Sequence, residues 1–368
     1  MRAGEKRFVT RHCVTASLRL AIAAAVLLLA SGCTNLGYYW QSVNGQLDVW
    51  RRERPIEEVI ADPSTARALK SRLARVLEIR AFASRELGLP DNQSYRRYAD
   101  LGRPFVVWNV FAAPEFSVQP EQWCFVFAGC VSYRGYFARE DAERFAAGLA
   151  AEGYDVFVGG VPAYSTLGWF ADPVLNTVIS YSGPRLARLL FHELSHQVVY
   201  VRGDTVFNES FAVAVEKEGV RRWLASRGSP QDKAGYEAAV ARQADFLQLA
   251  GTYQAKLASL YRSRMAPGAM RARKKELFGE MEREYRGLKD RWGGFAGYDR
   301  WFAQKPNNAL LASVGIYSQL VPAFEALLER EGRDLPRFYA AVRELAALPK
   351  EEREARMRAL TPPVMSDK

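Results

Sequence analysis

The segment RLLFHELSHQVVY runs from residue 188 to residue 200 and sets the pattern from which the rest of the chain can be interpreted. Leucines and valines recur in it, and just before it, at three- and four-residue spacings. That periodicity is typical of a helix with one apolar face. We therefore predict a helix from about residue 184 to residue 200, with its apolar face buried in the protein.

Two histidines of this segment, His192 and His196, are four residues apart and therefore share one face of the predicted helix. Side chains in this H-E-x-x-H arrangement bind one metal ion together, and neutral imidazoles suit zinc. Glu193 would not ligate the metal but would take a proton from a water molecule beside it. The chain has three histidines, and the third, His12, lies in the N-terminal leader described below. The segment predicts a catalytic zinc centre; the alternative is two surface histidines beside an ordinary glutamate.

A catalytic zinc takes three protein ligands, and no further histidine is left to supply the third. A downstream carboxylate is the expected donor, and Glu209 in the sequence FNESFA is the leading candidate. Asn208 is a good N-cap residue and predicts a second helix from residue 209 to about residue 224, with Glu209 on its first turn. Glu209 could instead be an acid that stabilises the start of that helix. The rival ligands are Asp204, Glu216 and Glu218, of which Glu216 better fits a partner that contacts a metal ligand.

The two halves of the chain differ in their patterns. Before the zinc helix, short β-branched and aromatic runs accompany two helical patterns, and the strand candidates are residues 104–111, 123–126, 131–137 and 155–158. The helical patterns there cover residues 63–87 and 139–152. From about residue 184 onward the pattern is helical, with a long charged helical hairpin at about 231–292 that could be a cap, a docking surface or an ordinary helical subdomain. The predicted fold class is α+β, with a small sheet in the N-terminal half and a mostly helical half after it.

The N-terminus has the pattern of a secretory leader. Four basic residues within the first eleven positions precede an apolar run of eleven residues, Leu20 to Ala30, which is too short to span a membrane. The run ends in LASGC, which resembles the lipobox of bacterial lipoproteins, although Ala30 stands where leucine is usual. We predict that Cys33 is the lipid-modified first residue of the mature chain; an ordinary cleaved signal peptide is the alternative. The predicted organisation is a signal peptide at 1–32, a tether at 33–62 and one metallopeptidase domain at 63–368.

The formal net charge of the chain is +10. Residues 1–32 carry five basic side chains and one acidic one, so the mature part is near +6. That surface suits anionic lipid or cell-wall polymer. Because the basic residues form no stripe with interleaved aromatics, nucleic acid is not an expected partner.

Two cysteines, Cys124 and Cys130, remain once Cys13 and Cys33 are assigned to the leader and to the lipid site. Their close spacing in an exported protein predicts a disulfide that closes a small loop. Two buried free thiols are the alternative. A metal site at these cysteines is not expected, since no further cysteine or nearby histidine could complete it.

The two motifs HELSH and NESFA together resemble those of the gluzincin metallopeptidases, the clan of thermolysin and the zinc aminopeptidases. More closely, the chain resembles a bacterial family of predicted aminopeptidases over nearly its whole mature length. This resemblance implies a thermolysin-like catalytic core, zinc, peptide-bond hydrolysis and the ligands His192, His196 and Glu209. The GAMEN motif that binds a substrate's amino terminus in well-known zinc aminopeptidases is absent. The segments that carry the closer resemblance are SYRRYADL at 94–101, WNV at 108–110, the cysteine loop into YRGYF at 123–137, AYSTLGWF at 163–170 and PNNA at 306–309.

The resemblance also suggests how a substrate is held. In gluzincins an edge strand before the zinc helix pairs with the extended substrate backbone, and the strand that ends at Gly159 and Gly160 is placed for this role. Tyr164 and Trp169 follow it and could line the pocket for a substrate side chain. The alternative is that both aromatic residues belong to the core.

A peptidase of this kind also needs a donor for the oxyanion that develops opposite the zinc. Histidine is excluded by count, so a tyrosine or an arginine must serve. Tyr317 is the leading candidate because it lies on a downstream helix, roughly where zinc aminopeptidases supply theirs. Tyr200 and Tyr133 are the alternatives.

Together these features predict a zinc-dependent peptidase of the bacterial cell envelope, acting as an aminopeptidase on peptide substrates. Lipidated Cys33 would hold it in a membrane on the periplasmic side, and Thr34 after the cysteine favours the outer membrane. The alternative is a non-catalytic envelope lipoprotein that uses a metallopeptidase-like fold to bind peptide or cell wall.

Overall fold

The computed structural model describes residues 37–125, 129–315 and 319–360. It divides into two units, and the described part of the first, residues 37–51, is helical. The second unit begins at Arg52 and contains every element discussed below. Within the described ranges, no helix combines the length and the apolar character that crossing a membrane requires. The predicted lipid site Cys33 and the predicted oxyanion donor Tyr317 lie outside the described residues.

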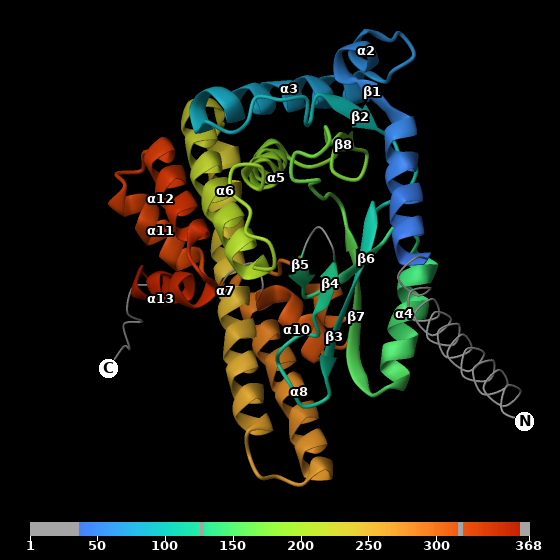
Figure 1. The fold of residues 1–368 in the computed structure, drawn as a ribbon, viewed down its shortest axis with the longest axis vertical. Helices are drawn as coiled ribbons and strands as arrows, with labels where there is room; N and C mark the ends of the chain where they lie inside the picture. The colour runs from blue at the N-terminus through green and yellow to red at the C-terminus, as the bar shows by residue number, and fades with distance from the viewer. Residues whose placement is uncertain (1–36, 126–128, 316–318, 361–368) are drawn as a thin grey trace, which may run out of the picture. The chain divides into compact units, whose positions relative to one another are not determined.

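The strands form three small sheets rather than one (Figure 1). β3 (Val107–Pro114) is the central strand of the largest and pairs antiparallel with β6 (Arg134–Tyr136) and β7 (Tyr154–Val161). Its β-branched and aromatic residues suit a strand that is buried along most of its length. The helix α4 (Arg139–Ala151) packs on this sheet. The other two sheets are β1-β2-β8 and β4-β5, with bounds β1 Glu53–Pro55, β2 Arg97–Ala99, β4 Trp123–Phe125, β5 Gly129–Val131 and β8 Val174–Leu175.

The helix α3 (Arg67–Leu87) follows the short helix α2 (Ile56–Ala61) and begins four residues later than the pattern starting at Pro63 suggests. Gly88 ends it in the left-handed conformation, with φ 63°, where a glycine carries no steric penalty. The buried side of α3 packs against the helix that carries the two histidines. The N-terminal half thus supports one side of the helix that carries His192.

That helix is α5 (Gly183–Ser195), and it packs along α6 (Thr205–Arg227). Gly219 of α6 allows the close approach, because a Cβ there would lie 2.6 Å from a ring carbon of Phe191 and 2.8 Å from a methyl of Leu87. α6 buries residues on most of its circumference, which is typical of a helix inside a core. α5 ends at Ser195, earlier than residue 200, and turns follow it to residue 198.

The helices α7 (Pro230–Tyr261) and α8 (Pro267–Arg291) pack side by side in the lower part of Figure 1. They occupy the stretch where a helical hairpin is predicted. A capping box begins α7, in which Ser229 and Asp232 satisfy each other's backbone N–H groups. The hairpin has an apolar cluster of its own, and α9 (Asp299–Phe302) and α10 (Asn308–Gly315) contribute to it.

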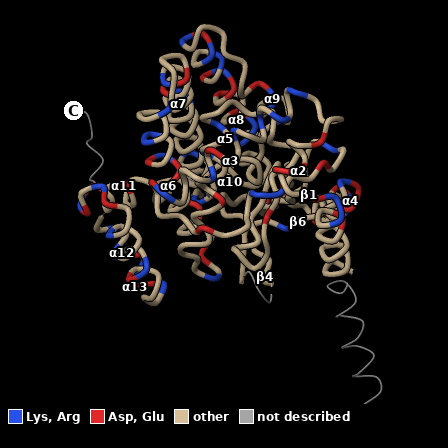
Figure 2. The backbone as a smooth tube through the Cα atoms, turned by 90° about the horizontal axis from the view of Figure 1, so that it is seen from above, with Lys and Arg blue, Asp and Glu red and all other residues tan. Residues whose placement is uncertain are grey.

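Three further helices, α11 (Val321–Arg330), α12 (Leu335–Ala347) and α13 (Lys350–Leu360), complete the helical half. α11 packs on α6, where the ring of Phe324 meets those of Phe207 and Phe211. Figure 2 shows basic and acidic residues interspersed along the helices. The α+β prediction is confirmed, with small sheets in the N-terminal half and a mostly helical C-terminal half.

Candidate metal centre

α5 and α6 bring together His192, His196 and Glu209. One ligand atom from each residue lies within 4.8 Å of the others. Glu209 Oε2 is 3.1 Å from His192 Nε2, and Glu209 Oε1 is 3.8 Å from His196 Nε2. The last turn of α5 supplies His192, the C-cap residue of α5 is His196, and the close packing of α6 brings in the carboxylate of Glu209. These are the three residues predicted to be the metal ligands.

The start of α6 differs from the prediction. The helix begins at Thr205, and its N-cap is Asp204, whose side chain accepts a hydrogen bond from Phe207 N at 3.1 Å. Asn208, the predicted cap, lies inside the helix and binds both N and O of Val201 at 2.8 Å. Asp204 is an equally good capping residue, so the sequence offers two caps four residues apart. Glu209 therefore lies on the second turn rather than the first.

The donor set suits a divalent transition metal. Two imidazole nitrogens and one carboxylate are a common set for catalytic zinc, which leaves a position open for water. Ligand bonds of about 2.1 Å in tetrahedral geometry place donor atoms about 3.4 Å apart. The separations of 3.1 Å and 3.8 Å lie on either side of that value. The two imidazole rings are nearly perpendicular, with centroids 5.0 Å apart, so their edges converge without clashing.

The pKa values of the two histidines are shifted in opposite directions by their surroundings. Burial lowers the pKa of His196 to about 4, so its imidazole is neutral at physiological pH, as a metal ligand must be. Burial alone would also lower the pKa of His192, but hydrogen bonds with Glu209 and Glu216 raise it well above the ordinary value. For Glu209, burial alone would raise the pKa, and the bond to His192 lowers it. Carboxylates that hold a proton on His192 in this way also favour a cation in its place.

Glu216 lies where a partner of a metal ligand is expected. Its Oε2 is 3.0 Å from His192 Nδ1, the ring nitrogen that faces away from Glu209. The other two rival ligands are occupied elsewhere. Asp204 forms an ion pair with Arg353 at 2.8 Å, and Glu218 pairs with arginines that include Arg221.

Glu193 lies between the two histidines on α5 and is 9% exposed. Burial raises its pKa to about 7, and the carboxylates of nearby residues add to the rise while His192 opposes it. A carboxylate with a pKa near the working pH can accept a proton and release it again. The general-base role of Glu193 stays a prediction.

A loop with two exposed aromatic residues lies beside the histidines. Trp169 is 75% exposed and Phe170 is 50% exposed. A Cβ on Gly168 would lie 3.4 Å from the side chain of Gln197, the residue after His196. Predicted substrate residue Tyr164 packs its ring edge-on against Phe137. Asp172 fixes the loop by accepting a hydrogen bond from Thr166 N at 2.9 Å.

Tyr95 also lies near the site, and the sequence did not single it out as a site residue. It is buried, its hydroxyl has no hydrogen-bond partner among the described residues, and its φ of 63° is unusual for a residue other than glycine. Burial raises its pKa well above the ordinary value, and the charge of Glu193 adds to the rise. Tyr200 is one of the alternative oxyanion donors. Burial raises the pKa of its hydroxyl, and the charge of nearby Glu209 raises it further. Tyr133 packs on Phe111 in the sheet.

Cys124 and Cys130 form a disulfide with an S–S distance of 1.97 Å. They are cross-strand partners in the β4–β5 hairpin. Gly129 of this hairpin lies against the loop between α5 and α6, because a Cβ there would lie 2.7 Å from Gly203 N. The hairpin thus contacts the loop that leads from His196 to Glu209.

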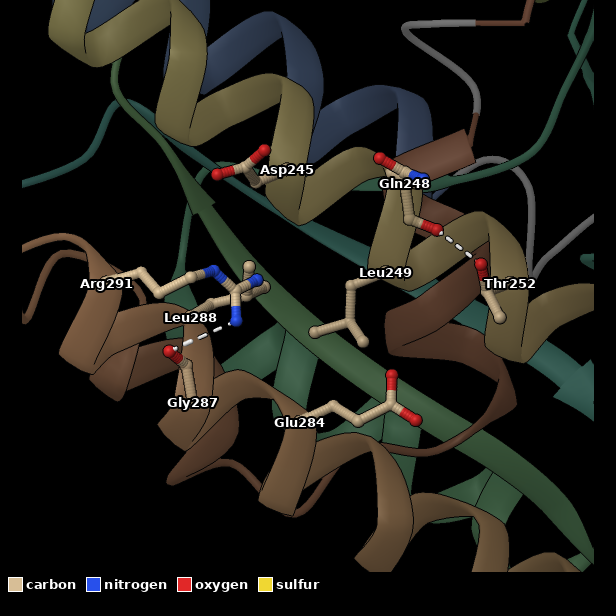
Figure 3. A pocket seen from close by; sticks show the side chains of 8 residues that line it. All are labelled: Asp245, Gln248, Leu249, Thr252, Glu284, Gly287, Leu288 and Arg291. Atoms are coloured by element: carbon tan, nitrogen blue, oxygen red, sulfur yellow. Dashed lines mark hydrogen bonds between the residues drawn. The ribbon is translucent and has the colours of Figure 1, made fainter. Parts of the chain in front are cut away.

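A pocket of about 360 Å³ lies on the helical hairpin formed by α7 and α8 (Figure 3). Its carboxylates already have partners within the hairpin: Asp245 accepts from Trp292 Nε1 at 2.8 Å, and Glu284 accepts from Tyr253 at 2.5 Å. The pocket shares no lining residue with the metal centre. Its lining residues are Asp245, Gln248, Leu249, Thr252, Glu284, Gly287, Leu288 and Arg291.

Comparison with known proteins gives one match. The model of a family described as "Putative aminopeptidase" matches residues 37–357. No curated protein and no solved structure matches the chain. The matched range includes all three residues of the metal centre, together with Glu193 and Glu216.

Proposed function

The chain belongs to this aminopeptidase family, and on that premise we propose that it is a zinc-dependent peptidase with His192, His196 and Glu209 as its metal ligands. One observation carries the proposal: two imidazoles and a carboxylate, far apart in the chain, converge within 4.8 Å. Zinc bound there would polarise a peptide carbonyl and make water more acidic. Family membership supports peptide as the substrate and aminopeptidase as the activity.

Glu193 is the general base of the proposed reaction. Its carboxylate takes the proton of the attacking water and passes it to the nitrogen of the departing amine. With a pKa of about 7, it can do both near neutral pH. Its burial keeps bulk water from competing for the proton. An oxyanion donor completes the site, for which Tyr317 stays the leading candidate.

We propose that the peptide backbone pairs with the free edge of β7. Val156 O accepts a hydrogen bond from the side chain of Asn307, so this carbonyl points away from β3. Ala112, its partner on β3, accepts from Glu121 N on the side away from β7. Backbone direction alternates along a strand, so Val158 and Gly160 also present N–H and C=O groups to the open edge. An extended peptide can bind such an edge as an added strand.

We propose further that the protein is anchored in the cell envelope through lipidated Cys33, facing the periplasm. The support is the leader alone: a basic start, a short apolar run and the LASGC sequence. Three acyl chains on the cysteine would make the anchoring effectively permanent.

A non-catalytic lipoprotein that binds peptide or cell wall is the second candidate. If the sequence lacked Glu193 or one of the three proposed metal ligands, this second candidate would be favoured. The chain retains all four residues.

Two variants separate ligand from base. Glu209→Ala should lose most bound zinc, because only two imidazoles remain. Glu193→Gln is nearly isosteric and should keep zinc while abolishing hydrolysis, because an amide cannot accept the proton. Metal content is measured by mass spectrometry, and hydrolysis with a mixed peptide library that includes N-terminally blocked members. If Glu209→Ala keeps one zinc per chain, the third ligand is elsewhere. If Glu193→Gln still cleaves peptides, hydrolysis does not depend on this site.

A further inference from the structure

The two histidines of the metal centre are held in different ways. The ring of His192 is fixed on both sides, with Nε2 3.1 Å from Glu209 Oε2 and Nδ1 3.0 Å from Glu216 Oε2. Nδ1 of His196 is buried and has no hydrogen-bond partner among the residues that the structure describes. Among the described residues, the Nδ1 side of His192 is therefore oriented by Glu216, whereas the Nδ1 side of His196 has no such hydrogen bond.

Glu216, which contacts His192 through one oxygen, is held by Arg188 through the other. Its side chain is 4% exposed, and its second oxygen, Oε1, accepts a hydrogen bond from Arg188 Nε at 2.6 Å. Arg188 lies one turn before His192 on α5, so its guanidinium and the imidazole approach the same carboxylate from one helix. A buried carboxylate needs such a partner, because leaving it unpaired is strongly unfavourable.

The contact extends to a third helix. Nη1 of Arg188 donates a hydrogen bond to Oε1 of Gln243 on α7, at 3.1 Å. The guanidinium is thus held by α6 through Glu216 and by α7 through Gln243. The hydrogen bonds between Gln243 and Arg188, between Arg188 and Glu216, and between Glu216 and His192 connect the long helical hairpin to a proposed metal ligand.

We propose that Arg188, held by Gln243, is a positioning residue that fixes Glu216 and through it the ring of His192. A carboxylate bound to Nδ1–H keeps the imidazole in the tautomer whose Nε2 lone pair faces the metal. Without the guanidinium, Glu216 would lose the partner that determines where its second oxygen lies. The proposal rests on the proposed function, since it requires a metal at His192.

The test measures zinc affinity rather than activity. The dissociation constant for Zn²⁺ is determined by competition with a chelator of known affinity, for the wild type and for Arg188→Met, which keeps an apolar stem. Loss of a partner that orients a metal ligand typically weakens binding by about 10- to 100-fold, and we expect that range here. The matched control is Arg221→Met, since Arg221 also pairs with a buried carboxylate of α6, at 2.8 Å, but not one that touches a histidine. Its zinc affinity should equal that of the wild type.

A double-mutant cycle shows whether Arg188 acts through Glu216. In a Glu216→Gln background, Arg188→Met should change the zinc dissociation constant by less than about threefold, because its target is gone. An equal loss in both backgrounds would overturn the proposal. Should Arg188→Met fold poorly, Gln243→Leu provides the second test, with a smaller loss in the wild-type background and none beside Glu216→Gln.

Failure of this inference differs from failure of the proposed function. A wild-type protein that binds no Zn²⁺ at micromolar concentration would overturn both. Tight binding by the wild type with an unchanged affinity in Arg188→Met would overturn the positioning role alone. A loss in Arg221→Met as large as in Arg188→Met would also overturn it, because the effect would then reflect general destabilisation of α6.

Discussion

Asp172 should make the protein less stable as the pH rises from about 4 to about 7, and replacing it by asparagine should remove that effect. The carboxyl is 4% exposed, and burial raises its pKa to about 6, with hydrogen bonds from the loop at 165–166 opposing the rise and the charge of Glu53 adding to it. Glu193 and Tyr95 are the other titratable groups that interact with it. The ordinary value of 3.8 applies to the unfolded chain.

The sign follows from the direction of the shift. Well below pH 3.8 Asp172 is protonated in both states, and its burial has no ionic penalty. As the pH rises through 6, the folded protein must either retain a proton that the unfolded chain has released or hold a buried charge, so stability is lost. A difference between about 6 and 3.8, at 1.36 kcal/mol per unit, corresponds to a loss of about 3 kcal/mol.

The assay is urea denaturation of wild type and Asp172→Asn at pH 4 and pH 7. Asparagine can still accept the hydrogen bond from Thr166 N, so the loop contact is preserved while the titration is removed. The stability of Asp172→Asn relative to wild type should increase by about 2 kcal/mol from pH 4 to pH 7, because at pH 4 the carboxyl of the unfolded chain is already partly ionised. Comparing the two proteins at each pH cancels the titration of all other groups. A relative stability that is the same at both pH values would refute the reasoning, because it would mean that the carboxyl is not held in a low-dielectric environment.

Three further predictions concern packing, anchoring and catalysis. Gly219→Ala should lower the free energy of unfolding by about 1–3 kcal/mol, measured by urea denaturation, because the new Cβ would lie 2.6 Å from the ring of Phe191; a variant of unchanged stability would contradict the close packing of α5 on α6. Cys33→Ala should move the protein from the membrane to the soluble fraction or leave an unprocessed precursor, and a normally processed variant that stays in membranes would exclude lipid anchoring. Tyr317→Phe should lower kcat by about a hundredfold with KM and zinc content unchanged; normal turnover would remove Tyr317 from the mechanism.

The convergence of the three proposed ligands could be predicted because their spacing is local or their alternatives are few. His192 and His196 are one helical turn apart, so the helix alone brings them together. Glu209 followed from the lack of any further histidine and from its place on the next helix. Glu216 followed from its position on the same side of that helix as Glu209. In each case a short-range rule was enough.

The remaining features depend on pairings that no local rule specifies. β2 pairs with β8 across more than seventy residues, and no sequence pattern indicated either this pairing or the division of the strands among three small sheets. Arg188 was part of the quoted segment, but its role depends on Gln243, fifty-five positions away. Tyr95 lies in a segment that carries the family resemblance, yet its left-handed backbone, and a hydroxyl with no hydrogen-bond partner in the part of the chain that the structure describes, are visible only in three dimensions.

The charged groups around His192 come partly from the local motif and partly from long-range packing. Three carboxylates, those of Glu193, Glu209 and Glu216, lie close enough for His192 to interact with each, and all three are largely buried. Arg188 neutralises part of that charge through Glu216 at 2.6 Å. The pKa of His192 is raised well above its ordinary value, so a proton on its ring, together with Arg188, compensates the charges of Glu209 and Glu216. The motif therefore supplies the proposed ligands, whereas the packing of α6 and α7 supplies the carboxylates and the guanidinium around His192, where a metal cation could take the place of the proton.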